Sequence, residues 1–220
     1  MRQAEGLHRR MGGSVESSRG GSHFATGARC FTPTSREAMV GVPRLGELRA
    51  MAVEFPVVHG HPNRLPFEGV LTLVDVASDK APNGARGHRV VLTRSAAEAA
   101  LPSLLGMAVD YKAGWDGHDA RQKCGIITSA QLNGKQLAVA GYLFARDFPE
   151  MEQKIQIEGA MGMSYELADA HVADMRANIW TLTKATFTGA AILLRDKAAY
   201  RETSFRLKRT RLAKPTRHAA

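Results

Sequence analysis

The chain has 220 residues, of which 44% are hydrophobic and 23% are charged. This composition provides enough apolar material for one ordinary hydrophobic core and excludes a wholly disordered chain. No apolar run approaches the roughly 18 residues that a membrane-spanning helix needs, so no membrane partner is expected.

The formal net charge of +9 is distributed unevenly along the chain. Residues 1–50 carry a net charge of +4, residues 51–200 a net charge of −1 and residues 201–220 a net charge of +6. The excess positive charge therefore lies in two terminal segments, which weakens the interpretation that the folded part binds nucleic acid. Nucleic-acid binding is expected only through the basic tail of residues 201–220.

Residues 1–50 are rich in glycine, serine and arginine and show no hydrophobic period. We expect them to form a disordered N-terminal segment. Two interpretations of this segment stay open, a pro-segment or a mis-assigned translation start, and its composition also resembles a transit peptide superficially. Residues 51–200 are expected to form the folded domain.

The first predicted elements of that domain are two strands and a helix. Apolar alternation predicts a strand over residues 65–77, and a shorter apolar run predicts another over residues 88–92. Ser95 and Glu98 have the spacing of a capping box, which predicts the start of a helix. Pro102 is expected to kink or end that helix.

An Asn133-Gly134 pair separates two apolar-alternating runs, residues 124–132 and residues 136–144. Asn-Gly between such runs is the strongest short-range signal for a β-hairpin, because both central positions of a type I′ turn need a positive φ. The sequence therefore predicts a hairpin with Asn133 and Gly134 as its turn.

A second helix is predicted after this hairpin. Asp147 is expected to cap it, with Pro149 in its first turn. The helix is expected to run to about Glu158, where Gly159 ends it.

Residues 162–172 and 179–194 have the composition of two further strands, and no periodic structure is predicted from residue 201 onward. The fold class predicted is α+β, with a β-rich body and about two helices.

Cofactor and metal signatures are missing from the sequence. There is no phosphate loop, dinucleotide fingerprint or HExxH motif, and the two cysteines lie far apart. Two pairs could ligate a metal, His59 with His61 and His118 with Asp119, but no spacing supplies a third or fourth ligand. No metal or cofactor is therefore expected.

A serine and a histidine remain as candidates for chemistry. Ser164 follows Gly162-Met163 at the start of a predicted strand, and small residues there let a substrate carbonyl approach the backbone closely. His118 lies in a polar loop beside Asp119. A serine hydroxyl is a weak nucleophile at neutral pH and needs such a base.

The order of these elements resembles the prohead (capsid maturation) protease family of tailed bacteriophages, whose fold is similar to herpesvirus assemblin. In that family a His-Asp element precedes a Gly-hydrophobic strand, matched here by His118-Asp119 and by residues 125–127. The nucleophile lies in a Gly-hydrophobic-Ser element, matched by Gly162-Met163-Ser164. The resemblance covers roughly residues 65–200. It implies that the domain of residues 51–200 is protease-like, a small, partly closed antiparallel β-barrel with a few flanking helices.

The resemblance also implies a function. The chain would be a serine endopeptidase of a phage or prophage, in which Ser164 is the nucleophile and His118 is the general base and then the general acid. Its substrates would be the scaffold and the major capsid protein, cleaved inside the assembling procapsid in the cytoplasm of the bacterial host. Self-association into a homo-oligomer stays open, as does the cleavage-site specificity.

One departure from the family supports an alternative. A later family strand reads Glu-Val-Ser-Leu-Val and ends in Pro-Ala-Asn, whereas here Lys184 stands at the acidic position and residues 189–191 read Gly-Ala-Ala. The alternative function is therefore a catalytically inactive head protein with the same fold, acting as a scaffold or assembly partner. For an active site, the third catalytic residue is left open between four candidates, which are Thr186, Thr188, Asp119 and Glu166.

Overall fold

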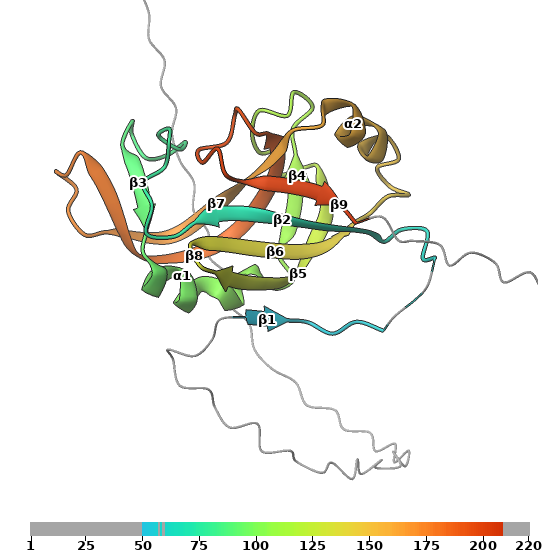
Figure 1. Cartoon of the computed structure of the whole chain (residues 1–220), viewed down its shortest axis with the longest axis horizontal. Coiled ribbons are helices and arrows are strands. Elements are labelled where there is room, and N and C mark those ends of the chain that lie inside the picture. Colours follow the sequence, from blue (N-terminus) through green and yellow to red (C-terminus); the bar gives the residue numbers. More distant parts are fainter. Residues whose placement is uncertain (1–49, 57, 59, 209–220) are drawn as a thin grey trace, which may run out of the picture. The chain divides into compact units, whose positions relative to one another are not determined.

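The computed structural model describes residues 50–56, 58 and 60–208 (Figure 1). The predicted disordered segment therefore lies outside the described residues except for Ala50, and so do His59 and residues 209–220. The elements are, in chain order, β1 (Ala50–Ala52), β2 (Leu65–Leu73), β3 (Arg89–Leu92), α1 (Arg94–Ala100), the 3₁₀ helix η1 (Leu101–Leu104), β4 (Ala108–Tyr111), β5 (Lys123–Asn133), β6 (Gln136–Leu143), α2 (Glu150–Glu158), β7 (Met161–Val172), β8 (Ile179–Leu194) and β9 (Ser204–Leu207).

The strands form one curled sheet in the order β3-β8-β4-β5-β6-β2-β9, with β1 added to β5 and β7 added to β8 (Figure 1). The sheet curls far enough for β7 to pack beside β2 and β9, to which it is not paired. Two pairs, β3–β8 and β4–β8, are parallel, and all the others are antiparallel. The fold is thus β-rich α+β with two short α-helices, but its sheet is mixed, and the wholly antiparallel arrangement that we expected is wrong.

Strand β8 organises the part of the sheet that matters for function. It pairs with β3 and β4 on one edge and with β7 on the other. Its bounds, residues 179–194, are those that the sequence predicts, and β7 starts one residue before its predicted position. A strand of this length carries two short parallel partners and one long antiparallel partner, so residues from distant parts of the chain lie side by side.

The first strand and helix differ from prediction in their ends. Strand β2 ends at Leu73 rather than near residue 77, since Asp75 takes a left-handed conformation (φ +54°). Helix α1 is capped by Thr93, whose side chain accepts a hydrogen bond from the backbone of Ala96. The predicted capping box at Ser95 is therefore wrong. Pro102 does end the helix, because η1 replaces it from Leu101 onward.

The hairpin of β5 and β6 is confirmed, but its turn lies one residue later than predicted. Asn133 still belongs to β5 and pairs with Gln136, so Gly134 and Lys135 form the turn. Of these residues only Gly134 has a positive φ, +58°. This is the pattern of a type II′ turn, in which glycine is needed at the first central position alone.

The predicted end of helix α2 is confirmed and its predicted cap is wrong. Gly159 ends the helix with a φ of +70°. The helix begins at Glu150, and Pro149 occupies the cap position without a side-chain hydrogen bond. Asp147 instead accepts a hydrogen bond of 2.8 Å from the side chain of Asn63.

Three short strands are not predicted from the sequence, and the first is β1, which has three residues. Strand β4 has four residues, and β9 lies where no periodic structure is predicted. Strand β9 pairs with β2, and the ring of Phe205 packs on Phe67 with 5.0 Å between ring centroids. The folded body therefore continues past residue 200. In the described part of the chain, no helix is long and apolar enough to cross a membrane.

Candidate active site

Three strands meet in one row at the candidate site. In the register of the sheet, Ala191 of β8 is the partner of Asp110 in β4 and also of Ser164 in β7. Partners in neighbouring strands project to the same face of a sheet, and strands are about 4.8 Å apart, so Asp110 and Ser164 lie about 10 Å apart across Ala191. The methyl group of Ala191 leaves room above the row for a larger group.

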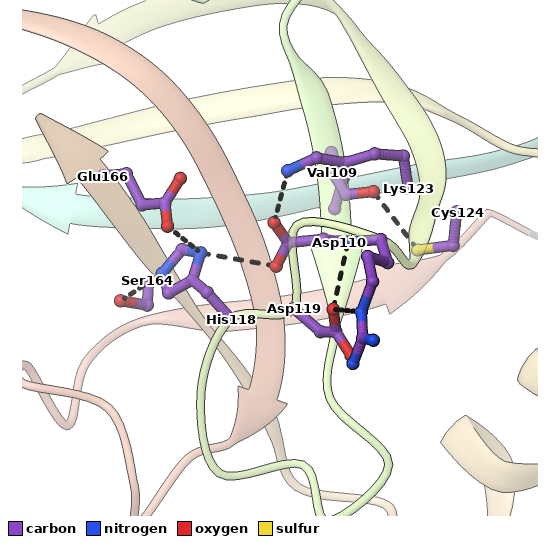
Figure 2. A network of polar contacts seen from close by, with 9 residues as sticks. Val109, Asp110, His118, Asp119, Lys123, Cys124, Ser164 and Glu166 are labelled. Carbon is purple, nitrogen blue, oxygen red and sulfur yellow. Dashed lines mark hydrogen bonds and ion pairs between the residues drawn. The ribbon is translucent and has the colours of Figure 1, made fainter. Parts of the chain in front are cut away.

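That group is the imidazole of His118, which lies between Ser164 and Asp110 (Figure 2). Its Nε2 atom is 3.2 Å from Ser164 Oγ, and its Nδ1 atom is 3.3 Å from Asp110 Oδ1. The side chain of His118 is 20% exposed, so the pair faces solvent on one side only. The structure thus brings together the two predicted catalytic residues, from a loop and a strand that are 46 positions apart.

The loop of residues 112–122 holds His118 in place. Its anchor is Trp115, which is buried against Tyr111 and whose carbonyl accepts a hydrogen bond from the backbone of Leu194. Trp115 has a φ of +53°, an uncommon conformation for a residue other than glycine. Packing therefore fixes a strained turn three residues before His118, and such strain is frequent near functional sites.

Gly162 allows β7 to present Ser164. A Cβ atom at Gly162 would lie 2.8 Å from Thr203 Oγ1 and 3.1 Å from the Cα of Arg195. A larger residue would push β7 away from these neighbours. The glycine of the Gly-Met-Ser element is therefore required by close packing on the face of β7 that carries Ser164.

The carboxylate nearest to His118 belongs to Asp110, which the sequence analysis did not select. Its side chain is fully buried, and Oδ2 accepts a hydrogen bond of 2.7 Å from Lys123 Nζ. Oδ1 faces His118 Nδ1 at 3.3 Å, but the alignment falls short of a hydrogen bond, and neither atom has a hydrogen-bond partner among the described residues. The short distance is that of a catalytic hydrogen bond, which is often poorly aligned before substrate binds.

A second carboxylate approaches the same nitrogen. Glu166 Oε1 lies 3.5 Å from His118 Nδ1, and the Glu166 side chain is 44% exposed. Its register partner is Gly189, where a Cβ atom would lie 2.8 Å from Glu166 Oε2. The glycine therefore leaves the space that lets Glu166 lie against β8.

The four predicted candidates for a third catalytic residue differ in their contacts with His118. Of the four, only Glu166 lies within ion-pair distance of His118. Asp119 instead accepts hydrogen bonds from Arg121, and these hold the pKa of its carboxyl below the usual range. Within the described residues, neither Thr186 nor Thr188 bonds to His118.

The signal for Asp110 was a lone acid between apolar residues in Ala108-Val109-Asp110-Tyr111, where Val109 and Tyr111 are buried. An ionisable residue inside such a run needs a partner.

Lys184, which stands at the acidic position of the family, lies opposite His171 and not opposite Ser164.

A cleft of about 810 Å³ opens beside Ser164 and His118. Its walls come from residues 80–86, from the loop that carries His118 and from the β7–β8 hairpin. The lining mixes apolar groups such as Leu167 and Trp180 with charged groups such as Glu166. This size lies in the range of ligand sites and leaves room for several side chains of a substrate.

Cys124 lies close to this site but does not belong to it. Burial raises the pKa of the Cys124 thiol to about 12, and the thiol donates a hydrogen bond to the carbonyl of Val109. A thiol in this state is not a nucleophile at neutral pH. Ser164 is therefore the nucleophile candidate of this site.

The comparisons with known proteins assign no family. No protein-family model matches the chain, and no curated protein matches it.

Proposed function

We propose that the chain is a serine endopeptidase of the prohead (capsid maturation) type. The observation that carries this proposal is the distance of 3.2 Å between His118 Nε2 and Ser164 Oγ at the mouth of a cleft. A serine and a histidine in this geometry, with a buried carboxylate behind the histidine, have the arrangement of hydrolases that use a serine nucleophile.

Each residue of the site would have a separate role in peptide hydrolysis. His118 Nε2 removes the proton of Ser164 while Ser164 Oγ bonds to the carbonyl carbon of the peptide, and the same proton then passes to the leaving amine. Water then hydrolyses the acyl-enzyme, as His118 Nε2 takes a proton from the attacking water and returns it to Ser164 Oγ. The carboxylate of Asp110 keeps a proton on Nδ1 and stabilises the imidazolium, and Lys123 Nζ, which donates a hydrogen bond of 2.7 Å to Oδ2, holds that carboxylate in position.

The substrate class and the setting rest on the sequence resemblance. We propose the scaffold and the major capsid protein as substrates, cleaved inside the assembling procapsid in the bacterial cytoplasm. We also propose that the curled sheet is a partly closed barrel of the assemblin type. The packing of β7 beside β2 and β9 supports this, and the parallel pairs of β8 are a departure from it.

The nucleophile can be tested without knowing the substrate. A fluorophosphonate probe should label Ser164 in the wild-type protein, as located by peptide mass spectrometry. Ser164→Ala should abolish labelling, His118→Ala should slow it strongly, and Ser129→Ala, which removes a half-buried serine of β5, should leave it unchanged. Absence of labelling at Ser164 in the folded wild-type protein would reject the enzyme and favour the inactive head protein.

The substrate class needs a second experiment. The chain is co-expressed with the major capsid protein and the scaffold of the same phage or prophage, as wild type and as Ser164→Ala. Mass spectrometry should show new termini in the capsid or scaffold protein with the wild type only. Identical termini in both samples would contradict the proposed substrates.

A further inference from the structure

Three donor atoms converge at the rear of the His118 ring, on the side away from Ser164. They are Asp110 Oδ1, His118 Nδ1 and Glu166 Oε1, and all lie within 4.8 Å of one another (Figure 2). Nδ1 is 3.3 Å from the first oxygen and 3.5 Å from the second. A tetrahedral Zn²⁺ ion with bonds of about 2.0–2.2 Å separates its ligand atoms by about 3.3–3.6 Å. The two measured spacings therefore match two edges of a zinc tetrahedron.

Two of these three atoms have no aligned hydrogen bond among the described residues, which also points to a ligand. Asp110 is fully buried, and its Oδ1 has no hydrogen-bond partner among the described residues. The same holds for His118 Nδ1. Without a metal the two atoms make only the poorly aligned contact of 3.3 Å described above, whereas buried polar atoms nearly always have a well-aligned partner. A cation between them would satisfy both lone pairs.

Charge and access favour the same conclusion. Two carboxylates face the centre, and Lys123 neutralises only part of their charge through Asp110 Oδ2. Glu166 is 44% exposed and lines the cleft, so it gives an ion a path from solvent and lets water fill a fourth position. One imidazole nitrogen with two carboxylate oxygens suits zinc, whereas magnesium prefers an octahedron of oxygens.

We propose that Asp110, His118 and Glu166 form a Zn²⁺ site that switches off the Ser164–His118 pair. A metal on Nδ1 needs the lone pair of that nitrogen, so the proton of the neutral ring moves to Nε2 and no net proton is released. Nε2–H then donates to Ser164 Oγ, and His118 has no lone pair left to accept the serine proton. The binding of zinc is independent of the proposed protease function, whereas the inhibition rests on it.

Binding is tested in the full-length Ser164→Ala protein, which keeps all three donors and cannot cleave itself. Zinc affinity and stoichiometry are measured by competition with a chromogenic chelator. Adding Glu166→Gln should remove one tight site or weaken it at least tenfold. Adding His171→Ala, which removes an exposed histidine of β7 outside the cluster, should change nothing.

Equal binding by the Ser164→Ala protein and its Glu166→Gln derivative would overturn the site, because the ion would then bind to other histidines of the chain. Glu166 is the primary variant since its side chain is partly exposed, and circular dichroism checks its fold. Asp110→Asn is the second variant, with the same expectation of weaker binding.

The inhibition is tested with the fluorophosphonate probe on the wild-type protein. Stoichiometric Zn²⁺ should slow labelling of Ser164 at least tenfold, and EDTA should restore the original rate. Tight zinc binding with an unchanged labelling rate would overturn the switch. Absence of labelling in the metal-free protein would reject the protease function instead, and the chelator experiment would still report on the site.

Discussion

Two carboxylates face the same nitrogen of His118, and the structure predicts that they contribute very differently to the rate. Coulomb's law gives about 5 kcal/mol for an imidazolium 3.3 Å from Asp110 at an effective dielectric constant of about 20, which suits a buried group. Glu166 is 44% exposed, and at 3.5 Å in a water-like dielectric its contribution falls to about 1 kcal/mol. The first value is an upper bound, since reorganisation offsets part of it.

We therefore expect Asp110→Asn to lower the labelling rate of Ser164 by about 10³-fold and Glu166→Gln to lower it by less than tenfold. Asparagine keeps the shape of the side chain but removes the charge that stabilises the imidazolium and selects the Nδ1–H tautomer. The assay is the second-order rate constant for fluorophosphonate labelling in metal-free buffer. Thermal unfolding of each variant serves as the control for folding.

The reverse order of the two variants would refute the reasoning, because it would make Glu166 the carboxylate that orients His118. Equal small losses would refute it too, since the buried position of Asp110 would then bring no catalytic advantage. A loss of labelling in Asp110→Asn that is matched by unfolding does not support a role of Asp110 in the reaction. In that case the rate is measured at a lower temperature, where the variant is folded.

Three further predictions concern stability and reactivity. Lys123→Met should lower the free energy of unfolding by about 1–3 kcal/mol in urea, less than for a fully buried pair because Lys123 is 36% exposed. Lys112→Met, which breaks an exposed ion pair, should lower the free energy of unfolding by less than about 1 kcal/mol. Equal losses in Lys112→Met and Lys123→Met would contradict the view that Lys123 stabilises the buried carboxylate of Asp110. Phe205→Ala should lower the free energy of unfolding by about 3–5 kcal/mol. A loss below about 1 kcal/mol would show that β9 does not contribute to the core. With Cys30 replaced by serine, Cys124 should resist iodoacetamide at about pH 8 until the protein unfolds, because a pKa of about 12 keeps the folded thiol protonated; rapid alkylation of the folded protein would contradict its burial.

The sequence predicted those parts of the site that have a local signature. Ser164 stands in a Gly-Met-Ser element, His118 stands in a glycine-bounded polar loop, and the bounds of β8 follow from its long apolar stretch. For Asp110 the only local signal is an acid between apolar residues, which is too weak to predict β4, because this strand is only four residues long and its pairing partners lie in β5 and β8. Propensity and periodicity act within a segment, whereas a short strand is stabilised by neighbours far away in the chain.

Strand β9 was missed for the same reason. Its residues pair with β2, and Ser204 Oγ accepts a hydrogen bond from the backbone of Val70, 134 positions earlier. Only the folded sheet provides that partner. The high positive charge of the segment favoured a solvated tail, and Phe205 was too isolated a signal to outweigh it.

Register links these observations to chemistry. Asp110 faces His118 because Asp110 and Ser164 both pair with Ala191, while Val109 and Tyr111 turn to the opposite, apolar face. A slip of one residue between β4 and β8 would bury the carboxylate in the core and place an apolar side chain beside the imidazole. The candidate site is therefore a property of the pairing of three strands, and its third residue is defined by a row of the sheet and not by a motif of the chain.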